Sequence, residues 1–425
     1  MSRRAFGPAA INLFLEEPMF RFLSILLLAA VPASPPPAAS VDALVAEALA
    51  KSPALAAARS RLAAAREMEA PAAALPDPTV EAMLQDAGFP NYTIGSEDMS
   101  MAGVEVRQAL PYPGKRRARA ASARADTDLR TAEAADLERQ ITAEVRRLFA
   151  RIYAVDKELE VYVAARDLVD LMSATAKSGY ATGGSDQEAL LKAQLQVTRL
   201  EERLDDLETE RASLVAELNR WLDRPGESAL GTIAALPVAP EPPGPWEERA
   251  VAASSPVRLA RAAVAAAERR AEVAKLDLKP DLSPAAGIAT RGPKGPVLTL
   301  RLGVELPFWR RQKQEPKIRA AEAELAAARL EQRDAEAKAR ADAARLEAEW
   351  AKAERQIVRF REGLVPQTSL AFDAARSSYL AGRGTFSTLN EDFILWLDAR
   401  VQLARREADR FALWAELEKL TGGAR

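Results

Sequence analysis

Apolar residues recur at intervals of three and four positions along two adjoining stretches of the chain. The first stretch, residues 115–177, contains neither proline nor glycine, and a helix of about 60 residues is roughly 90 Å long. Such spacing places one apolar stripe along each helix, so the pattern predicts a coiled-coil hairpin that folds at residues 179–186. The repeating positions are Leu137, Ile141, Val145, Leu148, Ile152, Val155 and Leu159, then Leu200, Leu204, Leu207, Leu214 and Leu218.

Two other stretches alternate apolar and polar residues with a period of two. Around residues 78–110 the alternation places Val80, Ala82 and Leu84 on one side. Around residues 283–306 the apolar side chains at 298, 300, 302 and 304 face one way, and Arg301 and Glu305 face the other. Each stretch contains a turn rich in glycine and proline, which predicts two β-hairpins.

The second half of the chain repeats the order of the first. Lys279-Pro280-Asp281-Leu282 answers Leu75-Pro76-Asp77-Pro78, and Leu306-Pro307-Phe308-Trp309-Arg310 answers Leu110-Pro111-Tyr112-Pro113-Gly114. We therefore predict a duplicated domain: a first repeat at 34–236, a proline-rich linker at 237–245 and a second repeat at 246–425. Each repeat would contain a helix, a hairpin, a long helix, a tip (179–186 or 379–385) and a final helix.

Residues 1–33 have the features of an export signal, with upstream arginines, a short apolar run and a small-x-small cleavage site. Met19 is an alternative start of translation, and a plain N-terminal anchor is the alternative interpretation of the segment. No later stretch approaches 18 consecutive apolar residues, so we expect no transmembrane helix after the leader.

Composition narrows the function classes. The chain has no cysteine and no histidine, which leaves no disulfide, no thiol nucleophile and no imidazole for catalysis or metal binding. Its formal net charge of −2 is not the excess of positive charge that is typical of nucleic-acid-binding proteins. No base–nucleophile or phosphate-loop spacing is present, so we predict no enzyme, no catalytic residues, no cofactor and no metal site.

Four strands with one apolar face cannot close a barrel by themselves, and an open sheet edge is not stable in lipid. If the apolar faces contact lipid, several copies must combine their strands. Two copies give eight strands and a filled interior, whereas three give twelve and a lumen, which we favour. The alternative is that the hairpins are soluble caps packed on helix ends.

The motifs Leu110-Pro111-Tyr112-Pro113-Gly114-Lys115 and Ser377-Ser378-Tyr379-Leu380-Ala381-Gly382-Arg383-Gly384-Thr385, in their duplicated order, resemble those of the TolC-type outer-membrane efflux protein family. The resemblance covers residues 41–422, and the first motif is similar to one of the heavy-metal branch. It implies a homotrimer with a twelve-stranded β-barrel in outer-membrane lipid and an α-helical tunnel across the periplasm. It also implies a periplasmic adaptor and an inner-membrane pump as partners.

By the same resemblance, the tips dock to the adaptor and the tunnel narrows just inside them. Tyr379 matches the family's constricting tyrosine, whereas the acidic positions fall on Thr388 and Glu391, with Asp392 adjacent. The acid after the first tip falls at Ala189 beside Glu188, and the arginine falls near Gly384, beside Arg383. The alternative interpretation is that these charges are solvated helix residues without a gating role and that the tips are simple glycine turns. The docking residues would be Gly179, Tyr180, Gly183, Gly184, Ser185, Gly382, Gly384 and Thr385.

The polar faces of the strands carry Glu105, Arg107, Arg301 and Glu305, which would line an aqueous lumen or, alternatively, the edge of a soluble sheet. Tyr112, Phe308 and Trp309 lie where strands become helices and suit an aromatic girdle or core packing. The sequence thus predicts a passive exit duct for metal ions or small toxic compounds. The rival predictions are an exported coiled-coil envelope protein without a channel and an exported helical enzyme.

Overall fold

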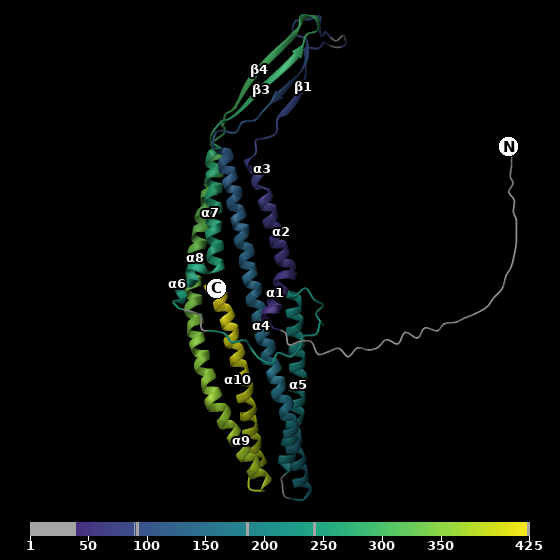
Figure 1. Cartoon of the computed structure of the whole chain (residues 1–425), viewed down its shortest axis with the longest axis vertical. Coiled ribbons are helices and arrows are strands. Elements are labelled where there is room, and N and C mark those ends of the chain that lie inside the picture. Colours follow the sequence, from purple (N-terminus) through teal and green to yellow (C-terminus); the bar gives the residue numbers. More distant parts are fainter. Residues whose placement is uncertain (1–39, 89, 91–92, 184–186, 241–243, 423–425) are drawn as a thin grey trace, which may run out of the picture. The chain divides into compact units, whose positions relative to one another are not determined.

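The computed structural model describes residues 40–88, 90, 93–183, 187–240 and 244–422. The predicted export signal, the tip residues Gly184 and Ser185, and residues 241–243 of the predicted linker lie outside these ranges. The described part is mainly helical with one small sheet, as predicted, and its elements are shown in Figure 1.

The helices differ widely in length. They are α1 (Val41–Lys51), α2 (Pro53–Glu67), α3 (Glu69–Ala73), α4 (Lys115–Ala181), α5 (Gln187–Trp221), α6 (Trp246–Ala253), α7 (Ser255–Leu276), α8 (Gln314–Arg359), α9 (Val365–Leu380) and α10 (Phe386–Thr421). The strands are β1 (Thr79–Gln85), β2 (Met101–Arg107), β3 (Asp281–Thr290) and β4 (Pro296–Glu305). A 3-10 turn, Gly292–Lys294, joins β3 and β4.

Serine and proline together separate α1 from α2. The Ser52 hydroxyl accepts a hydrogen bond from the Leu55 N–H (3.4 Å) and so caps α2. Pro53 occupies the first helical position, where no N–H is needed. Ser254 likewise stands at the N-cap of α7, but its side chain makes no capping hydrogen bond, and Pro256 is the second residue of that helix.

The apolar stripe of α4 forms the centre of the largest core cluster. Ile141, Val145, Leu148 and Ile152 are fully buried, and they pack with α1, α5 and α10. The stripe predicted from the spacing is therefore the one that the fold buries. Towards the end of α4, a second cluster joins Val169 and Met172 to aromatic residues of α9 and α10.

The second long helical arm is not one continuous α-helix. A π-helical turn, Phe360–Leu364, separates α8 from α9 directly before Pro366. Proline lacks an N–H and its ring displaces the carbonyl one turn earlier, so the widened turn accommodates it. The predicted long helix up to Tyr379 therefore consists of α8 and α9.

The four strands form one antiparallel sheet in sequence order. Each predicted hairpin contributes two neighbouring strands, and β2 pairs with β3. β3 begins at Asp281, ahead of the alternating run, although it contains Pro284. The Gln108 N–H donates to the Pro284 carbonyl (3.0 Å), so the side of Pro284 that lacks an N–H faces the end of β2 and leaves the ladder with β4 intact.

Within the described residues the strands and the helical turns lie at opposite ends of the long helices (Figure 1). Figure 1 shows the sheet at one end of α4 and α8, and the turns after α4 and α9 at the other. α2 and α5 lie along successive parts of α4, and α7 and α10 likewise contact α4. Two shorter helices placed end to end thus match one long helix.

A buried carboxylate joins three of these helices. Glu158 on α4 pairs with Arg203 of α5 (2.7 Å) and with Arg405 of α10 (2.6 Å), while its own side chain is only 4% exposed. Nearby, Asp156 pairs with Arg211 (2.5 Å) and accepts the backbone N–H of Ile233 (2.7 Å). The second contact holds the segment after α5 against α4.

We expect Glu158→Gln to lower the free energy of unfolding by about 2 kcal/mol. Breaking a fully buried ion pair costs about 3–5 kcal/mol, and the partly exposed guanidiniums reduce that cost. Thermal denaturation followed by circular dichroism would measure the effect as a lower apparent melting temperature. Glu160→Gln is the matched control, because Glu160 lies on the same helix with a side chain 68% exposed. Equal melting temperatures for the two variants would contradict the prediction.

Candidate functional site

The sheet has one apolar face, and it is exposed. Paired residues in an antiparallel sheet project to the same side, so the register groups Val80, Val106, Ala286 and Leu300 on one face. Leu300 is 74% exposed. The other exposed apolar side chains of this face are Leu84, Val104, Leu282, Ile288, Leu298, Leu302 and Val304. No described helix covers this face, which argues against soluble caps packed on helix ends.

The sheet also has two open edges. Among the described strands, β1 pairs only with β2 and β4 pairs only with β3. Each outer strand therefore presents a row of backbone groups ready to pair with another chain.

Three of the four predicted lumen residues meet on the polar face. Glu105 accepts ion pairs from Arg107 (3.3 Å) and from Arg301 (3.2 Å). Arg107 also contacts Glu81 (3.4 Å), which the sequence analysis did not single out. Glu81 and Glu105 are direct cross-strand partners, so without Arg107 two like charges would face each other. We call these four residues the Glu105 cluster.

Small residues on β3 make the cluster possible. Glu105 lies on β2 and Arg301 on β4, so their side chains must meet above β3. The polar face of β3 there consists of Ala285, Gly287 and Ala289. A Cβ on Gly287 would lie 3.2 Å from the Glu105 Cβ and 3.0 Å from the Val104 carbonyl oxygen, so only glycine leaves this space.

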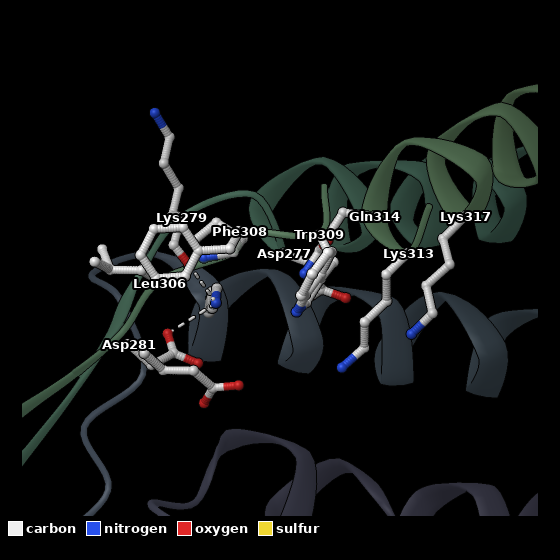
Figure 2. A pocket seen from close by; sticks show the side chains of 12 residues that line it. Asp277, Lys279, Asp281, Leu306, Phe308, Trp309, Lys313, Gln314 and Lys317 are labelled. Atoms are coloured by element: carbon white, nitrogen blue, oxygen red, sulfur yellow. Dashed lines mark hydrogen bonds and ion pairs between the residues drawn. The ribbon is translucent and has the colours of Figure 1, made fainter. Parts of the chain in front are cut away.

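Glu305, the fourth predicted lumen residue, lies elsewhere. It lines a cavity at the junction between β4 and α8 (Figure 2). In this cavity the buried Lys115 ammonium donates to the Asp281 carboxylate and the Lys279 carbonyl, both at 2.8 Å. The backbone N–H of Tyr112 also donates to Asp281 (2.7 Å). The motif at residues 110–115 of the first half thus binds the motif at residues 279–282 of the second half.

Aromatic and basic residues surround this junction. Phe308 and Trp309 are 79% and 72% exposed. Figure 2 shows the side chains of Lys313 and Lys317 extending from the start of α8 beside Trp309. The exposure favours an interfacial position over core packing for these aromatic residues.

Glycines shape both tips. Gly183 (φ +73°) donates its N–H to the Tyr180 carbonyl (3.2 Å), and Gly382 (φ +71°) donates to the Tyr379 carbonyl (3.0 Å). Gly179 is half-buried and Tyr180 is exposed. At the second tip, Gly384 donates its N–H to the Ser378 carbonyl (3.1 Å). The Thr385 hydroxyl accepts the Thr388 N–H (3.2 Å) and caps α10.

The predicted gate residues separate into two environments. Tyr379 packs edge-on against Phe386 at 5.9 Å, within the apolar cluster of α4, α5, α9 and α10. Arg383 and Thr388 are exposed, and Asp392 is half-buried.

Glu188 and Glu391 are connected through two residues that the sequence analysis missed. Lys192 pairs with Glu188 (2.7 Å) and contacts the Ser387 hydroxyl across the helices (3.4 Å), and Ser387 contacts Glu391 (3.3 Å). Hydrogen bonding and charge from Lys192 hold the pKa of Glu188 below its usual range. The i,i+4 spacings 188/192 and 387/391 are visible in the sequence, but the contact between α5 and α10 is not.

Among the described residues, no group of three or more acidic side chains is placed to hold a metal ion. None of the described helices combines the length and the apolarity that crossing a membrane requires.

The fold matches that of solved outer-membrane proteins. The outer-membrane channel OprN superposes with a TM-score of 0.78 at 16% identity, covering 90% of each chain. VceC of Vibrio cholerae gives 0.77 at 18% identity, covering 90% of this chain and 96% of its own. CusC, whose structures concern transmembrane channel formation, gives 0.76 at 15% identity, covering 90% of this chain and 92% of its own.

Sequence comparison finds a family match in the first half of the chain. Residues 44–222 match the family model described as outer membrane efflux protein. No curated protein matches the chain in sequence. The chain thus shares the sequence pattern of this family over residues 44–222, and the fold of OprN and VceC over 90% of its length.

Proposed function

We propose that this protein is the outer-membrane channel of a tripartite efflux system and acts as a passive exit duct. The observation that carries the proposal is the exposed apolar face of a four-stranded sheet with two open edges. In lipid such a face is favourable, provided that every edge finds a partner. OprN is described as an outer-membrane channel and CusC as forming a transmembrane channel, which supports this role by shared fold.

Ring closure by three copies would satisfy the edges. The four strands alternate in direction, so β4 of one copy meets β1 of the next as an antiparallel partner. Three copies give a barrel of about twelve strands, wide enough for a lumen. The apolar face would then contact lipid, and the Glu105 cluster would face water. The helices would continue as a tunnel in the periplasm.

The two tips would form the periplasmic end of the duct. Their exposed backbone and small side chains would dock to an adaptor, which would connect the duct to an inner-membrane pump. The link from Glu188 through Lys192 and Ser387 to Glu391 ties α5 to α10 just behind the tips. We propose that this link favours the closed state and that adaptor contacts shift the population towards the open one. The cargo would be metal ions or small toxic compounds.

We expect the detergent-purified protein to be a trimer that forms ion-conducting pores in planar bilayers. The alternative, a coiled-coil envelope protein without a channel, predicts no conductance. Light scattering with detergent correction gives the mass of the oligomer, and current recordings test the pore. A monomer that stays in solution without detergent would contradict the proposal.

Cysteine pairs would test the closing contact, because the chain has no cysteine of its own. Val80→Cys would be combined with a second cysteine at each position from 298 to 304. We expect disulfide-linked dimers and trimers only for the even positions, which share the apolar face with Val80. Each single-cysteine variant is the control. Equal linkage at odd and even positions would argue against the proposed contact.

Lys192→Glu should increase the mean single-channel conductance, because Glu188, the new carboxylate and Glu391 repel one another and loosen the tips. Lys177→Glu is the matched control, because Lys177 is exposed near the end of α4 and the substitution makes the same change of charge. If both variants conduct like the wild type, the proposed link does not hold the tips.

A further inference from the structure

We infer that the Glu105 cluster is a charge filter in the barrel lumen. In this filter Arg107 and Arg301 favour anionic solutes, and Glu105 positions the two arginines and limits their excess positive charge. The inference rests on the proposed channel and adds a determinant of what passes through it. Both arginines converge on one carboxylate, although they come from different strands, β2 and β4.

The accessible charge of the cluster differs from its formal charge. The Glu105 side chain is 4% exposed, whereas those of Arg107 and Arg301 are 43% and 52% exposed. Glu81, at 47%, is the accessible acid of the group. A solute passing over this face therefore meets two guanidiniums and one carboxylate, while the second carboxylate lies beneath them. Guanidinium is always protonated and binds carboxylate or phosphate groups in a bidentate manner.

Threefold closure would concentrate this effect. Each copy contributes the same two guanidiniums at the same height, so the lumen would carry a ring of them. With one accessible carboxylate, Glu81, for every two guanidiniums, the excess charge of the ring is positive. An excess of one sign along a narrow aqueous path raises the local concentration of the opposite ion. We therefore expect solutes with carboxylate or phosphate groups to pass this level more readily than cations of similar size. Of the two proposed classes of cargo, the filter thus favours small anionic compounds over metal cations.

Glu105 acts on solutes only through its neighbours. It holds the Arg301 guanidinium above Ala285 and Gly287, and it also pairs with Arg107. Without its charge, Arg107 would keep Glu81, and Arg301 would lose the carboxylate that it pairs with. The balance of the ring would then move towards positive charge.

The test is the reversal potential in a KCl gradient across a planar bilayer, with all variants in the full-length trimer. We expect Glu105→Gln to raise the chloride-to-potassium permeability ratio by roughly threefold, the factor for a potential change of about one kT. Arg301→Gln should lower the ratio, and the double variant should return it towards the wild-type value. A merely structural role for Glu105 would not give opposite shifts that cancel in the double variant.

Glu227→Gln is the matched control, because Glu227 is exposed after α5 and far along the chain from the strands. It should leave the ratio unchanged. If Glu105→Gln does not assemble, Arg301→Gln alone decides the sign. A conducting wild-type trimer whose ratio is unchanged, or changed in the same direction, by both substitutions would overturn the filter. A wild-type trimer that does not conduct would instead contradict the proposed channel.

Discussion

The structure depends on one constraint, which is that the backbone at the edges of the sheet must find hydrogen-bond partners. The apolar face of the sheet favours hydrocarbon, where water cannot supply those partners. The four-stranded sheet satisfies its inner strands alone, and in the proposed trimer other copies pair with the outer strands. An even number of alternating strands allows identical copies to close a ring. In the proposed trimer the helices that continue from the strands would also be arranged around that ring.

The described helices share three apolar core clusters, of which the largest lies around the middle of α4. Acids such as Asp156 and Glu158 are buried beside this core because each is paired with an arginine on a neighbouring helix. Paired charges fix the relative positions of two long helices more specifically than an apolar stripe does. The stripe can pack in several registers, whereas a given charge pair forms in only one.

Periodicity in the sequence predicted the elements but not the contacts between them. The α4 stripe, the two hairpins and the glycine turns follow from local rules, and the structure contains each of them. The interruption of the second long helix before Pro366 follows from proline chemistry, although the apolar spacing alone does not indicate it. The Glu105 cluster and the Lys192–Ser387 contact join residues separated by roughly 200 positions. Such pairings depend on sheet register and helix rotation, which one sequence does not determine.

The same pairings determine which charges can act on a solute. Asp281 and Glu105 both lie on the polar face, but Asp281 is bound to the buried Lys115 and Glu105 lies under two guanidiniums. A count of acidic and basic residues treats these carboxylates as equal to exposed ones, and the net charge of −2 therefore says little about the proposed lumen. Because a buried, paired carboxylate mainly orients its partners, the accessible arginines dominate the field that a solute meets. Selectivity in such a duct is thus set by burial within the sheet as much as by composition.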